Sequence, residues 1–91
     1  MQQDGTVTVE FFGIPRQRAG RQELTVPAGT LGEILAAVER HCPGLAGLRD
    51  AAGRLSPHYL LSIDGRAFVD GADNRFAPGQ RLLLLSADVG G

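Results

Sequence analysis

The residues with the clearest potential for chemistry are the last four of the sequence, Asp88-Val89-Gly90-Gly91. The main-chain carboxylate of Gly91 is an acyl group that no Cβ shields, and consecutive glycines adopt backbone angles closed to other residues. Such an end can pass through a narrow channel into the active site of another protein. The alternative is a glycine tail without a role, since chain ends commonly fray. The pattern indicates either an acyl group presented to a partner or a plain terminus.

Other residue types that support catalysis or metal binding occur without the spacing that such chemistry needs. His41 and Cys42 are neighbours, and adjacent residues on a helix do not face each other, so a buried structural cysteine is the favoured interpretation. His58 belongs to no metal-ligand motif. The acidic stretch from Asp70 to Asn74 lacks the closing glutamate of a calcium loop, because position 81 is arginine. We therefore expect no metal ion and no cofactor bound by this chain.

The composition fits one small globular domain without a strong attraction to nucleic acid or membranes. The chain has 91 residues, a net charge of −1 and 43% hydrophobic residues. No apolar run approaches the ~20 residues of a membrane span, and the first residues lack the features of a signal peptide, so we expect a cytoplasmic protein. All nine basic residues are arginine. Without lysine there is no phosphate-binding GxxxxGK[ST] loop.

Three of the arginines, Arg16, Arg18 and Arg21, lie close together in residues 13–20 or just after them. This stretch contains Pro15 and is bounded by glycines, so we predict that it is a hairpin connection. The arginines either belong to a solvated turn or form a patch for an acidic partner surface or a phosphate.

The elements that must position these residues follow from hydrophobic periodicity. Residues 6–11 and 23–26 alternate apolar and polar side chains, which predicts two paired antiparallel strands. Thr30 and Glu33 match a capping box, and the apolar spacing that follows predicts a helix that stops near His41, before Pro43. Residues 43–57 favour a short turn or loop.

The second half of the chain predicts three further strands. Residues 58–63 and 66–69 flank Asp64-Gly65, a strong signal for a two-residue hairpin. Residues 81–86 include four consecutive leucines, which favours a central strand that is buried on both faces and lies beside the first strand. Residues 70–79 between these strands are expected to form a polar loop.

This order of elements predicts an α+β fold of the β-grasp, or ubiquitin-like, type. We expect one domain over residues 1–91, with a mixed sheet of four to five strands and one main helix packed on one face. A flexible C-terminal Gly-Gly tail, residues 87–91, should leave the end of a central strand. Five extended residues reach about 17 Å, enough to bring the Gly91 carboxylate into a partner's active site.

The chain resembles the ubiquitin-like sulfur carriers of the MoaD/ThiS family over residues 7–91. The resemblance rests on the segments Val9-Glu10-Phe11-Phe12-Gly13, Val26-Pro27-Ala28-Gly29-Thr30-Leu31, His41-Cys42-Pro43-Gly44-Leu45, Ser62-Ile63-Asp64-Gly65 and Gly90-Gly91. It implies that the protein is a carrier and not an enzyme by itself. Within the family, the chain is most similar to the small subunit of molybdopterin synthase, because it has an extra segment between the helix and the third strand.

The resemblance also implies a reaction sequence and a set of partners. A ubiquitin-activating-like adenylyltransferase would use ATP and magnesium to adenylate Gly91, with Gly90 helping to thread the tail. A sulfur-donor enzyme would then convert the adenylate to a thiocarboxylate. An acceptor enzyme, such as the large subunit of molybdopterin synthase, would receive the sulfur for cofactor biosynthesis.

The resemblance leaves the acceptor open, because the residues before Gly90-Gly91 lack the proline usual in molybdopterin-type tails. Thiamin, cysteine and tungsten-cofactor pathways remain alternatives, as does a ubiquitin-like modifier conjugated to other proteins through Gly91. A plain interaction module is a third possibility. We expect partner contacts at Phe12, Phe68, Phe76 and Val89, with Tyr59 as a further aromatic candidate. Because large aromatic side chains are usually buried, we also expect at least two of the four aromatic residues to lie in the core.

Overall fold

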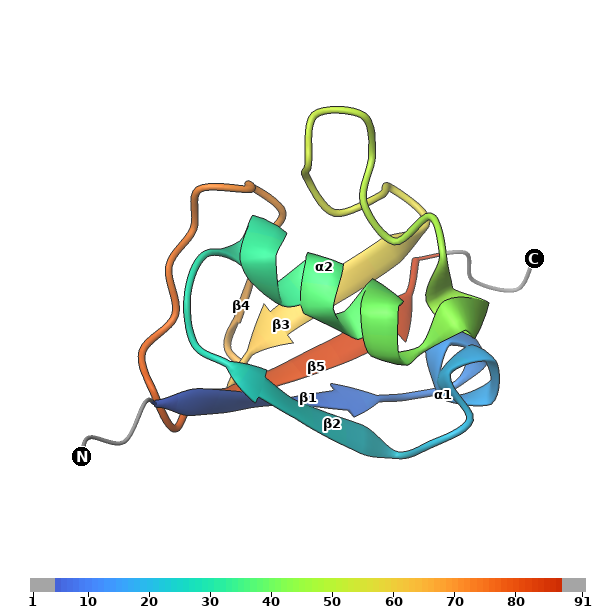
Figure 1. Ribbon diagram of the computed structural model, residues 1–91, viewed down its shortest axis with the longest axis horizontal. Helices are drawn as coiled ribbons and strands as arrows, with labels where there is room; N and C mark the ends of the chain where they lie inside the picture. Colours follow the sequence, from blue (N-terminus) through green and yellow to red (C-terminus); the bar gives the residue numbers. More distant parts are fainter. Residues whose placement is uncertain (1–4, 88–91) are drawn as a thin grey trace.

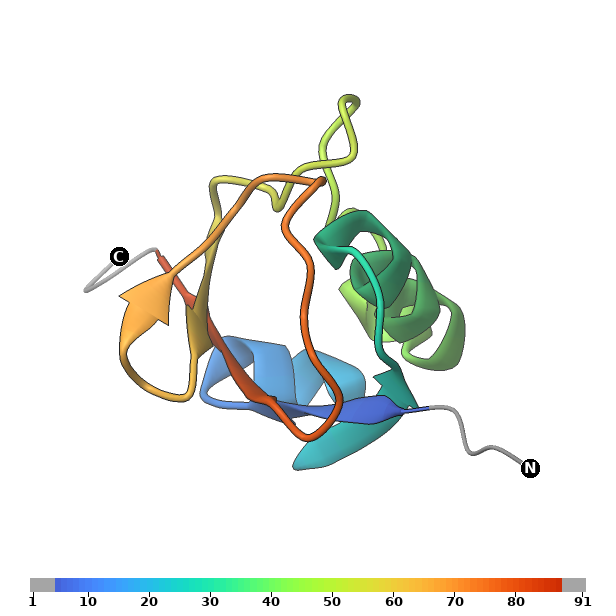
Figure 2. The same cartoon turned by 90° about the vertical axis from the view of Figure 1, so that its left-hand side faces the viewer.

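The computed structural model describes residues 5–87, which contain five strands, two α-helices and one 3-10 helix (Figure 1). The elements in chain order are β1 (Thr6–Phe11), α1 (Ile14–Ala19), β2 (Glu23–Pro27), α2 (Leu31–His41), the 3-10 helix η1 (Pro43–Leu45), β3 (Tyr59–Ile63), β4 (Ala67–Phe68) and β5 (Arg81–Ser86). The helix α2 lies across one face of the sheet (Figures 1 and 2).

The strands form one mixed sheet in the order β2-β1-β5-β3-β4. β1 pairs antiparallel with β2 and parallel with β5, and β5 pairs antiparallel with β3. The last strand of the chain is therefore central and lies beside the first, as its leucine-rich sequence predicts. This topology confirms the expected β-grasp fold, with one main helix over a five-stranded sheet.

The helix α2 begins and ends where the sequence predicts. The Thr30 hydroxyl accepts a hydrogen bond from the Glu33 backbone N–H at 3.2 Å, and the Glu33 carboxylate accepts one from the Thr30 N–H at 2.9 Å. The bond from the Thr30 backbone N–H, and after it the Thr30 hydroxyl, lower the pKa of the Glu33 carboxyl group. The apolar stripe of α2 packs into a core with the inner face of the sheet; the stripe comprises Leu31, Ile34, Leu35, Ala37 and Val38.

Residues 13–20 connect the antiparallel strands β1 and β2, as predicted, but residues 14–19 of this connection form the helix α1, which was not predicted from the sequence. Pro15 occupies the first turn of α1, where a missing N–H costs no hydrogen bond. Gly20 ends the helix in the left-handed conformation, and its N–H donates to the Arg16 carbonyl at 3.0 Å. With only six residues, the segment is too short for hydrophobic periodicity to reveal it.

The turn between β3 and β4 closes around Asp64-Gly65, as predicted, but is one residue longer than expected. Both residues have positive φ angles, 52° and 72°, and the Arg66 N–H donates to the Ile63 carbonyl at 2.9 Å. Strand pairing resumes only at Ala67, which lies opposite Ile63. Three residues therefore separate the paired positions.

The leucines of β5 are not buried on both faces, contrary to the sequence prediction. Leu82 and Leu84 are fully buried under α2, whereas Leu83 and Leu85 are half-buried. The strand alternates because α2 covers one face of the sheet and no described element covers the other. In addition, no described helix is long and apolar enough to cross a membrane.

Candidate functional site

The central strand β5 leads directly to the carboxyl end of the chain. It ends at Ser86, and the next N–H, that of Ala87, donates to the His58 carbonyl at 2.9 Å. The predicted site residues Val89, Gly90 and Gly91 lie outside the described residues. The described part therefore fixes the point from which the last residues depart, beside the start of β3.

An apolar surface adjoins this point on the sheet face opposite α2. We define the outer patch as Phe12, Leu60, Phe68, Leu83 and Leu85. Leu85 pairs with Leu60 across β5 and β3, and side chains of paired residues lie on the same face of a sheet. Phe68 is 66% exposed, and Phe12 and Leu60 are about 40% exposed. Exposed apolar side chains gathered on one face are typical of a protein-binding surface.

The outer patch agrees with part of the predicted contact set. Phe12 and Phe68 belong to it, whereas Phe76 is only 5% exposed and packs in the core. Phe76 is therefore corrected from a partner contact to a core residue, because the 70–79 loop folds this one apolar side chain inward. Tyr59 is also buried. The leucines of the patch were not predicted from the sequence, because β5 was expected to be buried on both faces.

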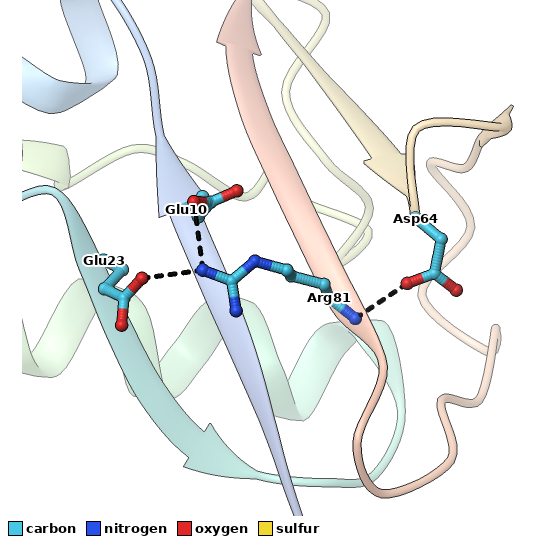
Figure 3. A network of polar contacts seen from close by, with 4 residues as sticks. All are labelled: Glu10, Glu23, Asp64 and Arg81. Atoms are coloured by element: carbon cyan, nitrogen blue, oxygen red, sulfur yellow. Dashed lines mark hydrogen bonds and ion pairs between the residues drawn. The ribbon is translucent and has the colours of Figure 1, made fainter.

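The same sheet face carries a charged cluster around Arg81, the first residue of β5 (Figure 3). The Arg81 guanidinium donates to Glu10 at 3.0 Å and to Glu23 at 2.8 Å, which links β5 to β1 and β2. The Arg81 backbone N–H donates to the Asp64 carboxylate at 3.1 Å. The arginine thus ties three strands and the β3–β4 turn together, and its partner Glu10 lies across from Leu83 of the outer patch.

The Glu10–Arg81 bond predicts a pH-dependent contribution to stability. The hydrogen bond from Arg81 lowers the pKa of the Glu10 carboxyl group. A lowered pKa in the folded state stabilises the protein above the unfolded-state value of about 4.3, and this stabilisation disappears as the pH falls through the folded-state pKa. We expect Arg81→Gln to lower the melting temperature at pH 7 and to lower it less at pH 3, as measured by circular dichroism. A melting-temperature difference that does not change with pH would contradict this assignment.

The single cysteine, Cys42, lies in the environment of a buried structural residue and not of a reactive one. Cys42 caps the C-terminus of α2 and is 1% exposed. Burial raises the pKa of its thiol, which disfavours the reactive thiolate. The ring of His41 turns away to the Ala37 carbonyl, 2.9 Å from Nδ1. The predicted buried cysteine is therefore confirmed.

The three clustered arginines lie on α1 and just after it, and all are exposed. They line different hollows of the surface. Arg18 lines a cavity beside Tyr59, whereas Arg16 and Arg21 line a separate hollow. The sequence shows that the three arginines are close together along the chain, but it does not show that they line two different hollows.

Comparisons with known proteins identify the fold but no family by sequence. No protein-family model matches the chain, and no curated protein matches it significantly. Among solved structures, small archaeal modifier protein 1 of Haloferax volcanii superimposes with a TM-score of 0.78 at 23% identity, covering 96% of this chain and 100% of that one. The Haloferax volcanii HVO 2177 protein gives 0.75 at 25% identity, with 100% and 92% covered.

A third solved structure has the same fold. A protein of Pyrococcus furiosus described as molybdopterin converting factor, subunit 1, has a TM-score of 0.71 at 17% identity, covering 90% of this chain and 97% of that one. The chain thus has the ubiquitin-like β-grasp fold. The resemblance to MoaD/ThiS-type proteins that the sequence indicates is confirmed at the level of the fold.

Proposed function

We propose that this protein is a ubiquitin-like sulfur carrier whose reactive group is the carboxylate of Gly91. The chain supplies the acyl group and a docking surface, and partner enzymes supply the catalysis. The observation that carries the proposal is the outer patch, which lies beside the point where β5 releases the last residues of the sequence. A partner that covers the patch would have the carboxyl end within reach, since five residues extend about 17 Å.

The proposed chemistry has two steps. An adenylyltransferase binds ATP and magnesium, and a Gly91 carboxylate oxygen attacks the α-phosphorus as the bond to pyrophosphate breaks. Hydrosulfide, or an equivalent delivered by a sulfur-donor enzyme, then attacks the acyl carbon. The bond between that carbon and the AMP oxygen breaks, and a thiocarboxylate remains on Gly91. Gly90 allows this end to enter a narrow channel because it has no side chain.

The outer patch can supply the free energy that ordering the tail consumes. Fixing each backbone residue costs about 1–2 kcal/mol, so a tail alone would bind weakly. Phe68 and Leu60 border a hollow of about 290 Å³ at the edge of the sheet, which could accept an apolar side chain of the partner. Central aromatic and aliphatic anchors of this kind commonly dominate interface energies.

Molybdopterin synthesis is the acceptor pathway that we favour. The support is the sequence resemblance to the small subunit of molybdopterin synthase, together with the fold shared with the Pyrococcus furiosus converting-factor subunit. In that assignment the acceptor is a large synthase subunit, which would bind the same outer patch after activation.

The proposal is tested by mass spectrometry of the intact chain. The protein is incubated with a ubiquitin-activating-like adenylyltransferase from its own genome, ATP, magnesium and sodium sulfide. We expect a product that is heavier by the difference between a sulfur and an oxygen atom, and no such product without ATP. An unchanged mass, under conditions in which the enzyme thiolates another carrier, would contradict the proposal.

Conjugation to other proteins is the second candidate function. It is favoured by the fold shared with small archaeal modifier protein 1 of Haloferax volcanii. The same acyl adenylate would then react with a lysine amine of a target, with AMP leaving as the amide forms. Because this chain contains no lysine, it could not extend itself through side-chain amines.

Denaturing gels of cell extract, probed for this protein, separate the two functions. A modifier would produce bands of higher mass that disappear when Gly91 is deleted. A carrier used only for sulfur transfer would give the free chain alone, whether or not sulfur is limiting.

A further inference from the structure

A cavity of about 400 Å³ opens where α1 and η1 meet the start of β3 and the end of β5. Its lining includes Ile14, Arg18, His58, Tyr59 and Ser86. Because Ser86 is the last residue of β5, the cavity adjoins the point from which the carboxyl end departs. Tyr59 and Ser86 pair across β3 and β5 next to the Leu60–Leu85 pair, and because successive side chains of a strand alternate, the cavity lies at the same end of the sheet as the outer patch but on the opposite face.

The Arg18 side chain is held in place within this cavity. Its Nη1 donates a hydrogen bond of 2.8 Å to the hydroxyl of Tyr59, a residue that is only 7% exposed. The backbone is fixed as well, because η1 packs so closely on α1 that a Cβ at Gly44 would collide with the Arg18 carbonyl oxygen. The guanidinium is therefore positioned before any partner binds, which reduces the entropy lost on binding.

Arg18 has no carboxylate partner within residues 5–87. The described ion pairs that involve arginine are made by Arg49, Arg54 and Arg81. A guanidinium has five N–H donors, and the hydrogen bond to the Tyr59 hydroxyl uses one of them. Most of the planar fork thus remains open toward the cavity.

We propose that this cavity receives a carboxylate side chain of the adenylating partner and that Arg18 forms the ion pair with it. The inference rests on the proposed function and names the chemistry of its partner surface: an acidic residue beside the channel that takes the carboxyl end. A carboxylate suits the site better than a phosphate does. The cavity offers one guanidinium fork next to the apolar side chain of Ile14, and a fork binds a carboxylate through two parallel bonds.

Steady-state kinetics of pyrophosphate exchange test the ion pair, with the chain as the varied substrate of the adenylyltransferase. We expect Arg18→Gln to raise KM for the chain about tenfold, because charge-assisted hydrogen bonds are lost, while kcat changes little. Tyr59→Phe keeps the charge but removes the group that holds it, and should raise KM by a smaller factor. Melting temperatures confirm that both variants are folded.

Arg40→Gln is the matched control. It removes the same charge from an exposed position on α2, away from the cavity, and should change KM less than twofold. Equal KM values for the Arg18 and Arg40 variants would overturn the proposal, since the effect would then be one of net charge. A wild-type chain that supports no exchange would instead contradict the proposed function itself.

Two further measurements distinguish a carboxylate of the partner from inorganic phosphate as the anion that Arg18 binds. In the partner, charge reversal of the acidic residue that faces Arg18 should be compensated by Arg18→Glu, with a KM closer to that of the wild-type pair than either single variant gives. If inorganic phosphate raised the melting temperature of the wild-type chain but not that of Arg18→Gln, the site would be a phosphate site, and the carboxylate assignment would be wrong.

Discussion

Deletion of Gly91 is expected to abolish adenylation and thiocarboxylate formation completely while leaving the melting temperature unchanged. The described fold closes with β5 at Ser86, and the core residues all lie between Val7 and Leu84. A shortened chain therefore keeps its packing but presents its carboxylate one residue too early, at Gly90. Pyrophosphate exchange measures the loss, and thermal unfolding measures the stability.

A chain with one alanine added after Gly91 serves as the companion variant. It keeps both glycines but moves the carboxylate beyond the position that the partner's active site accepts. We expect no exchange with this chain either. Full activity in either variant would show that the reactive group does not depend on the last residue of the sequence.

Placing a charge in the outer patch should weaken partner binding strongly. Phe68 is two-thirds exposed and Leu60 is also exposed, so Leu60→Asp and Phe68→Asp remove few contacts within the fold. Anchor residues at the centre of an interface contribute about 2 kcal/mol or more, so we expect KM for the chain to rise by at least about tenfold in each variant. Exposed substitutions of this type change stability by only about 0.5 kcal/mol.

Thr25→Asp is the control for this experiment. Thr25 is exposed on β2, at the opposite edge of the same sheet face, and lies across from Thr8. The control adds the same charge outside the patch and should leave KM within twofold of the wild-type value. An equal loss for Thr25→Asp would mean that the whole face, or its charge, and not the outer patch, determines binding.

Local sequence patterns were sufficient to locate the main helix and three of the strands. The capping box at Thr30 and Glu33 and the apolar stripe of α2 located the main helix, and the alternation of β1 and β2 located the first hairpin pair. β5 was placed centrally because of its leucines. The fold class followed from the order of these elements, without any long-range contact.

The features that the sequence analysis missed depend on contacts between segments that are far apart in the sequence. α1 is a single short helix whose proline reads equally well as a turn. The burial of Leu83 and Leu85 depends on whether a second layer covers the sheet, and their sequence does not encode that. The sequence favours a core position for at least two of the four aromatic candidates but does not show which two, and the structure places Phe76 and Tyr59 in the core.

The candidate site also has one part that the sequence predicts and another part that only the folded structure reveals. Its reactive end, Gly90 and Gly91, can be proposed from the sequence, because its chemistry needs nothing but a carboxyl group and small residues. Its supporting surface cannot. Arg18 and Tyr59 are 41 positions apart, and Glu10 and Arg81 are 71 positions apart, so their contacts exist only in the folded chain.

Locating the added sulfur within the chain tests the central claim most directly. Because the chain has no lysine and Arg81 is its last arginine, trypsin releases residues 82–91 as one peptide, while Cys42 falls in a separate peptide between Arg40 and Arg49. After reaction with the adenylyltransferase, ATP and sulfide, tandem mass spectrometry should find the additional mass on Gly91 in the 82–91 peptide. Sulfur on the Cys42 peptide, with residues 82–91 unmodified, would contradict the account.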